Sequence, residues 1–299
     1  MTPTATTRPR LACEVLSDRV IAGRASERRD YVELFTTRGL GGGTVIPALA
    51  AANVTDPATL RQAVADALAA IAGRSRDVTA IVPDAAVRVF LLDFDTLPDR
   101  PAEAAAVVRF RLRKSLPFDV ERAQVSYQAA RRNGALKVVA AVASASVIEE
   151  YEALFHDAGY HPGVVLPSML AALRPLEAQR PTLVAKVDAG SVTVAIVEQG
   201  ELRLLRTLEN AYGTAIDGKQ LADEIHPSLV FFQDTYGAAV ERILLAGLPN
   251  PDLITLPLES QTGIKAEPLV TSRYLGTSLS GDPAEKSLLA GVIGALVEA

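Results

Sequence analysis

The chain has 299 residues and a net charge of −5, with 49% hydrophobic and 22% charged residues. This length accommodates one large domain or two of ordinary size, and the composition is globular rather than disordered. The negative charge argues against general attraction to nucleic acid or anionic lipid. A single cysteine, Cys13, excludes an internal disulfide and fits a reducing compartment.

Targeting, membrane and metal signals are absent from the pattern of residues. The N-terminal stretch MTPTATTRPR lacks the apolar core of a signal peptide, and no apolar run approaches the roughly 18 residues that span a bilayer. The three histidines show no metal-ligand spacing, so we expect no metal site built from them. These observations predict a cytoplasmic protein that reaches a membrane only by docking on a membrane protein.

The first part of the chain predicts three strands, a helix and a fourth strand. The helix is rich in alanine and ends at Gly73, as helices often end at glycine. The strands are short apolar runs rich in β-branched residues, which is typical of buried strands. The strand ranges are 11–15, 19–25, 31–37 and 77–83, and the helix range is 57–73.

The middle of the chain predicts a small α/β insertion over residues 86–165. Its first helix stops at Pro117, because proline cannot continue a helix interior. A helix over residues 166–180 is expected to return the chain to the first lobe. The insertion should contain a strand over 87–94, a helix over 103–116, a hairpin over 125–144 and a helix over 146–159.

The last part of the chain repeats the order of the first part. Strands are predicted over 183–188, 192–198, 201–209 and 242–247, with a helix over 214–236 before the last of them. Setting Glu14 against Asp188 aligns the two β-β-β-α-β units. A duplicated unit predicts two similar α/β lobes that face each other across a cleft, one over residues 1–85 and the other over 181–299.

Several stretches carry a resemblance to a known family. The turn VDAGSVTVAIVEQG and the terminal helix SLLAGVIGALVEA resemble the actin-like ATPase superfamily, whose fold is ribonuclease H-like. The stretches KSLPFDVERAQVSYQ, VIEEYEALFHDAGYHPGVV and LADEIHPSLVFFQDTYGAAVERILLAGLP resemble the type IV pilus assembly protein PilM family. The related cytoplasmic domain of the type II secretion L protein stays open as an alternative.

The resemblance implies an adaptor of the pilus machine. Members of the family are cytoplasmic and hold the N-terminal tail of an inner-membrane partner, PilN, in a groove beside the inserted subdomain. This chain would then lie at the inner membrane through its partner, and self-association into a homo-oligomer stays open. Two rivals remain: an active ATPase or small-molecule kinase of the same superfamily, and a polymerising cytoskeletal protein.

The resemblance also implies ATP with Mg²⁺ between the lobes in typical members. Backbone N–H groups of two hairpins would hold the phosphates, and a strand-end acid would organise the metal ion. The matching residues are Asp188, Gly190, Ser191 and Thr193 in the second lobe, Glu14 in the first lobe and Gly247 in the adenosine loop.

Two of these three loops depart from the pattern. Leu16 stands where the first hairpin should have glycine, and Leu248 and Pro249 follow Gly247 where a second glycine is expected. A side chain at the first position would crowd a phosphate. We therefore expect a degenerate nucleotide site, no catalytic residues and a nucleotide-free scaffold rather than an enzyme.

A partner site is predicted on the first helix of the insertion. Arg109 and Arg113 lie four residues apart on one helix face, beside Leu116, Pro117 and Phe118. These residues suit an acidic or carboxamide-rich peptide, and a solvated helix face is the alternative interpretation of the arginines. The edge of the hairpin over 125–144 and a groove between the insertion and the first lobe stay open as further places for an extended tail.

Overall fold

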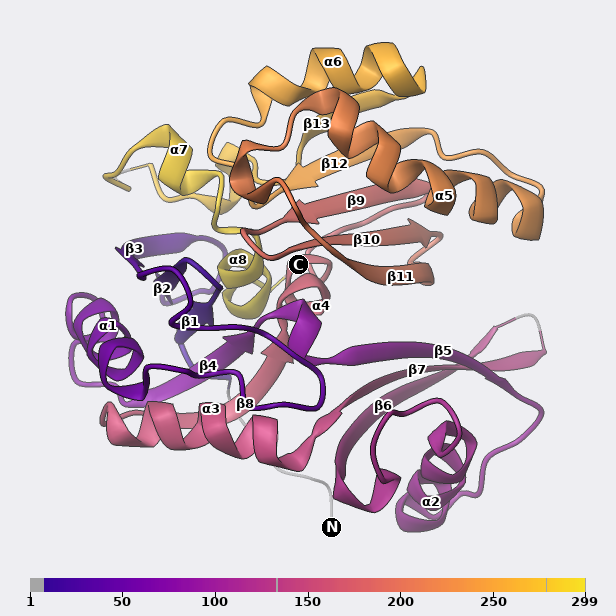
Figure 1. Cartoon of the computed structure of the whole chain (residues 1–299), viewed down its shortest axis with the longest axis horizontal. Helices are drawn as coiled ribbons and strands as arrows, with labels where there is room; N and C mark the ends of the chain where they lie inside the picture. The colour runs from indigo at the N-terminus through magenta and orange to yellow at the C-terminus, as the bar shows by residue number, and fades with distance from the viewer. Residues whose placement is uncertain (1–7, 133, 278, 299) are drawn as a thin grey trace.

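The computed structural model describes residues 8–132, 134–277 and 279–298. The N-terminal stretch considered for targeting lies mostly outside them. Figure 1 shows two lobes stacked on each other and a third unit that extends sideways from the lower lobe. Among the described residues, none of the helices combines the length and the apolar character that crossing a bilayer requires.

The first lobe is a five-stranded sheet in the order β3-β2-β1-β4-β8. Strands β1, β2 and β3 are antiparallel, whereas β4 and β8 are parallel to β1. The strands are β1 (Leu11–Val15), β2 (Arg19–Ala25), β3 (Val32–Gly39), β4 (Asp77–Val82) and β8 (His161–Pro167). Outside the insertion, the helices of this half of the chain are α1 (Pro57–Ala69), α3 (Ala145–Asp157) and α4 (Ser168–Ala172).

The second lobe repeats this topology in the order β11-β10-β9-β12-β13. The strands are β9 (Thr182–Val187), β10 (Ser191–Glu198), β11 (Glu201–Glu209), β12 (Arg242–Ala246) and β13 (Lys265–Pro268). The helices are α5 (Gly218–Tyr236), α6 (Asp252–Thr262), α7 (Pro283–Lys286) and α8 (Ala290–Leu296). The duplicated actin-like fold predicted from the sequence is confirmed, and the sequence patterns did not predict β8 in the first lobe or α6, β13 and α7 in the second lobe.

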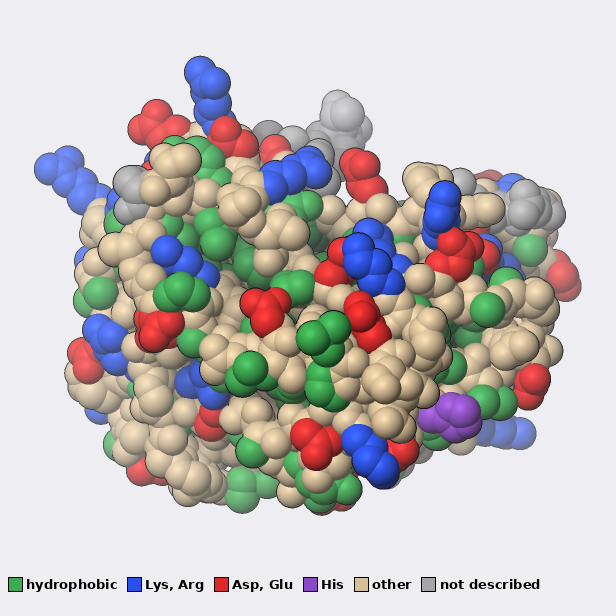
Figure 2. Space-filling view, turned by 90° about the horizontal axis from the view of Figure 1, so that it is seen from above, with side chains coloured by type: hydrophobic (Ala, Val, Ile, Leu, Met, Phe, Trp, Pro, Cys, Tyr) green, Lys and Arg blue, Asp and Glu red, His purple; other side chains and the backbone are tan. Residues whose placement is uncertain are grey.

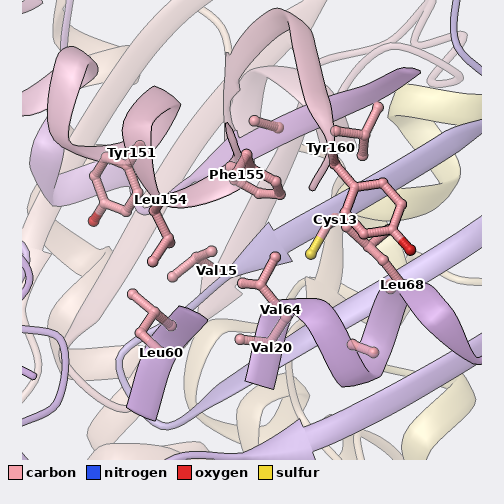
Figure 3. Packing of buried hydrophobic residues seen from close by; sticks show 14 of the residues in the cluster. Cys13, Val15, Val20, Leu60, Val64, Leu68, Tyr151, Leu154, Phe155 and Tyr160 are labelled. Carbon is pink, nitrogen blue, oxygen red and sulfur yellow. The ribbon is translucent and has the colours of Figure 1, made fainter. Parts of the chain in front are cut away.

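Both sheets are covered on two faces, which explains why their inner strands read as continuous apolar runs. Helices α1 and α3 cover one face of the first sheet, where Cys13 belongs to the same buried cluster as Tyr151, Phe155 and Tyr160 (Figure 3). Helices α5 and α6 cover the corresponding face of the second sheet. Helix α5 begins with a capping box in which Asp217 and Gln220 bond each other's backbone N–H groups.

Helices α4 and α8 lie between the two lobes, where α4 also contacts β4 and β8 of the first sheet. Helix α4 follows the first lobe in sequence, yet Met169 packs among residues of the second sheet. Helix α8 ends the second lobe, yet Val292 and Leu296 pack on the first sheet. The helices meet so closely that a Cβ built on Gly294 would lie 1.8 Å from the carbonyl oxygen of Ala171. The two helices therefore connect the lobes.

The insertion is a separate three-stranded sheet in the order β5-β7-β6, covered on one face by α2. Its elements are β5 (Arg88–Phe94), α2 (Pro101–Leu112), β6 (Ala123–Arg132) and β7 (Ala135–Ser144). The expected boundary at residue 165 is corrected, because α3 packs in the first core and β8 pairs with β4. The insertion therefore ends at residue 144.

The sequence patterns did not predict strand β8, and there is a physical reason for this. It contains Pro162, Gly163 and Pro167, residues that weaken a strand assignment. Proline is tolerated there because β8 is an edge strand with only β4 as a neighbour. In the second lobe, residues 247–251 alone connect β12 to α6 where the first lobe carries its insertion.

Candidate functional site

The candidate site lies where the turns of the two equivalent hairpins meet. Residues 16–18 join β1 to β2, and residues 188–190 join β9 to β10. Val15 pairs with Val20 across the first turn, and Val187 pairs with Val192 across the second. The two turns therefore have equal length, and the two hairpins have the same register.

This register changes the expected alignment of the halves. Glu14 is equivalent to Lys186, and Leu16 is equivalent to Asp188. The alignment of Glu14 with Asp188 was wrong by two residues, because it matched acid with acid, whereas turn length sets hairpin register. The side chain of Leu16 is buried in the same apolar cluster as residues of α8.

Glu14 and Lys186 meet between the lobes. The Nζ atom of Lys186 lies 3.3 Å from Oε1 of Glu14, and the side chains are 3% and 0% exposed. The hydroxyl of Ser168, at the start of α4, donates a short hydrogen bond to the same Oε1 atom. The backbone of Gly291 lies against the carboxylate, since a Cβ there would fall 2.6 Å from Oε2.

Two further carboxylates act on the same ammonium group. Burial lowers the pKa of Lys186, but the negative charges of Glu14, Asp84 and Asp188 outweigh this and raise the pKa above its ordinary value. Asp84, in the single 3₁₀ turn after β4 (Asp84–Ala86), accepts the backbone N–H of Met169 at 2.7 Å. Burial raises the pKa of Asp84 to about 6, although the Lys186 charge opposes that rise.

The residues expected to hold phosphate and Mg²⁺ do not fit that role. Oδ1 of Asp188 accepts the N–H groups of Gly190 at 2.7 Å and Ser191 at 3.1 Å, so the turn's own carboxylate uses the donors a phosphate would need. A Cβ on Gly190 would lie 3.0 Å from Oγ of Ser17 in the facing turn. Thr193 lies within the sheet and bonds Thr207 at 3.3 Å.

The adenosine loop is likewise occupied by the chain itself. Gly247 has φ +76°, and a Cβ there would lie 2.0 Å from the carbonyl oxygen of Val187, so the packing of β9 explains this glycine. Leu248 is buried in the core of the second lobe. The hydroxyl of Ser287 lies 2.7 Å from the carbonyl oxygen of Leu248 and 3.0 Å from that of Pro249.

Metal ligands are also missing from this region. In the part of the chain that the structure describes, no group of three or more His, Cys, Asp and Glu side chains is arranged to hold a metal ion. The three carboxylates at the lobe junction are instead arranged around an ammonium group. The chemistry that this arrangement provides is charge neutralisation between the lobes.

Sequence reasoning missed Lys186, Asp84 and Ser168. A signal existed for the first of them, because charged residues are rarely fully buried unless they are paired. The strand LACEV has one acid among apolar residues, and LVAKV has one base at the equivalent position. The hairpin register was needed to show that these positions correspond.

The predicted partner residues are not brought together as one open groove. Arg109 donates from Nη1 to the carbonyl oxygens of Val120 at 3.1 Å and Ala123 at 3.0 Å, which fixes the chain after α2. Leu116 and Phe118 are half-buried and pack in the core of the insertion. Arg113 and Pro117 are exposed.

A different groove runs along the free edge of β11. Strand β11 ends its sheet, and β5 of the insertion lies beside it (Figure 1). Two cavities of about 920 Å³ and 730 Å³ lie between them, and both are lined by Val89, Leu205 and Arg206. We call this the β11 groove, with residues 200–210 on one side and 87–93 on the other.

The β11 groove combines apolar surface with unpaired positive charge. Leu91 is 38% exposed and Phe231 is 49% exposed, and both line it. Arg88 and Arg206 are exposed and form no ion pair with any described residue. On the second-lobe face shown in Figure 2, by contrast, charges of both signs alternate.

Comparison with known proteins found likeness in structure only. No family model matches the chain, and no curated protein matches it. A chain of a PilM-PilN type IV pilus biogenesis complex has a TM-score of 0.79 at 18% identity, over 97% of this chain and 98% of that one. At this identity the likeness establishes the fold.

Two other solved structures share the fold more distantly. The cytoplasmic domain of EpsL, an inner-membrane component of the type II secretion system of Vibrio cholerae, has a TM-score of 0.54 at 11% identity, over 95% and 94% of the two chains. The ethanolamine utilization protein EutJ from Carboxydothermus hydrogenoformans has a TM-score of 0.56 at 11% identity, over 99% and 92%.

Proposed function

We propose that this chain is a scaffold of a pilus or secretion assembly at the inner membrane, where it holds the cytoplasmic N-terminal tail of a PilN-like protein. The observation that carries this proposal is the likeness to the PilM-PilN complex, which covers 97% of this chain, including the insertion. The lower TM-score of the EpsL domain makes type II secretion the second candidate.

The scaffold works without catalysis in this proposal. In the turn that would bind phosphates, the Asp188 carboxylate already accepts the N–H of Gly190. In the adenosine loop, Ser287 donates a hydrogen bond to the carbonyl oxygen of Leu248. A protein that binds its partner through a groove needs neither ATP nor Mg²⁺ for that task. The proposed role is therefore to position a membrane protein, with attachment to the membrane through that partner.

The tail is proposed to bind in the β11 groove. The free edge of β11 offers backbone groups to an extended peptide, and the apolar side chains around it offer pockets for alternate residues. Arg88 and Arg206 match a tail that carries a carboxylate among apolar residues. The helix surface around Arg113 and Pro117 is the competing position.

Capture of purified tail peptides tests whether the chain binds such a tail and which of the two assemblies the tail comes from. Cytoplasmic tails of a PilN-like protein and of a type II secretion partner are immobilised, and binding of the full chain is measured by surface plasmon resonance. We expect the PilN-like tail to bind and the other tail to bind more weakly. The reverse order favours the secretion candidate, and failure of both tails to bind rejects the scaffold proposal.

A further inference from the structure

The structure assigns Lys186 as a built-in cation that joins the two lobes, in the place where the family resemblance puts Mg²⁺ and phosphate. The inference stands apart from the proposed partner, because it concerns only how the lobes are held together. It begins from the observation that the residues of the nucleotide site do not fit a nucleotide.

The pair crosses between the duplicated halves. Lys186 belongs to β9 of the second lobe, and Glu14 belongs to β1 of the first lobe. Their charged atoms lie 3.3 Å apart with almost no exposure to solvent. In such surroundings a carboxylate left without its counter-ion is strongly disfavoured, so each side chain requires the other lobe to be in place.

Two helices that lie between the lobes, α4 and α8, surround the Glu14 end of the pair. Ser168 of α4 bonds the Glu14 carboxylate, and Gly291 of α8 packs its backbone on it. Lys186 is thus enclosed by elements from both lobes. Ser168, Lys186 and Gly291 thus surround the Glu14 carboxylate, where Mg²⁺ and the water molecules that it usually keeps would have to lie.

Charge around the ammonium group supports the same role. Asp84 and Asp188 add their negative charges to that of Glu14, and these charges keep Lys186 protonated despite its burial. Without the Lys186 charge, the carboxylates of the two lobes would repel each other. One lysine therefore supplies the charge that lets the closed arrangement exist without a metal or nucleotide.

The first experiment adds ligands to the unmodified chain. Thermal unfolding is measured with millimolar Mg²⁺-ATP, with Mg²⁺-ADP, with Mg²⁺ alone and with EDTA. A ligand that binds the folded state raises the melting temperature in proportion to the logarithm of its concentration. We expect no shift with any addition, and a concentration-dependent rise with Mg²⁺-ATP or Mg²⁺-ADP overturns the inference.

The second experiment is a double-mutant cycle on the pair. Lys186→Met keeps the length of the side chain but removes its charge, and it should lower the melting temperature strongly or prevent folding. Glu14→Gln combined with Lys186→Met also removes the unpaired carboxylate charge at position 14. The double variant should recover most of the melting temperature that Lys186→Met loses. If Lys186→Met alone fails to fold, the double variant still tests the inference. The inference then requires the double variant to fold.

Lys219→Met is the matched control. Lys219 also pairs with an acid, Asp223 at 2.9 Å, but both side chains are about 70% exposed. Its loss should change the melting temperature little. A Lys186→Met variant no less stable than this control, or a double variant no more stable than Lys186→Met, rejects Lys186 as the cation between the lobes.

Discussion

Glu14 and Lys186 occupy equivalent positions of the two halves of the chain and bind each other in the interior, with 3.3 Å between their charged atoms. Equivalent positions of the two halves therefore carry opposite charges. Because the halves face each other, residues at equivalent positions near the common axis are brought into contact. An ion pair between them stabilises the arrangement of the lobes rather than the fold of either lobe.

Asp84 gives the chain a measurable pH dependence. Its pKa is about 6 in the folded state and 3.8 as a free side chain, because burial favours the neutral form. The folded state therefore binds more protons, and the stability that Asp84 contributes is complete below pH 3.8 and is lost as the pH rises through 6. The loss is on the order of 3 kcal/mol at neutral pH, from a shift of about 2 pKa units.

We expect Asp84→Asn to remove this loss, since the amide oxygen still accepts the Met169 N–H. The variant should gain stability over the natural chain at pH 8 and differ little at pH 4, by denaturant unfolding at both pH values. Asp234→Asn, at an exposed position of α5, should show no such trend. A gain equal at both pH values contradicts the assignment to Asp84 ionisation.

Gly294→Ala should destabilise the chain although alanine favours helices. The helix preference contributes about 1 kcal/mol, but the new methyl group would overlap the Ala171 carbonyl oxygen. Overpacking of this kind costs about 1–3 kcal/mol or more, so the clash prevails. Chemical denaturation measures the difference. Gly163→Ala, in open space on β8, should leave the midpoint nearly unchanged.

Cys13 should react with thiol reagents only when the chain unfolds. The residue is fully buried, and burial together with the Glu14 charge raises the pKa of its thiol, so the reactive thiolate is scarce. Because it is the single cysteine, its labelling reports one site. We expect Ellman's reagent to react at the rate of unfolding. Fast labelling in native buffer would show that the first core opens locally.

Arg206→Glu should weaken capture of a PilN-like tail about tenfold, because it places a negative charge where the groove offers a positive one. The same binding assay compares it with Arg113→Glu, on the competing surface of the insertion. Arg61→Glu, an exposed charge reversal on α1, serves as the control. Weakening by Arg113→Glu alone would move the tail to the insertion helix.

The amino-acid sequence by itself determined the duplicated lobes. Buried strands such as LVAKV and RVIAGRA are recognised as short runs of mostly apolar residues. Long helices such as α5 are recognised by the helical spacing of their apolar residues. These signals are local, so they can be recognised without knowing the partner surfaces. The position of the insertion followed from the same signals, although its end was placed about 20 residues late.

Only the tertiary structure decided how the halves meet. Whether Glu14 faces a metal ion or Lys186 depends on hairpin register and on two helices between the lobes, α4 and α8, that contact residues more than a hundred positions away. Arg109 looked free on its helix but is bound by the carbonyl oxygens of Val120 and Ala123. A sequence shows which side chains carry charge, whereas only the packing of distant segments shows which charges are already paired.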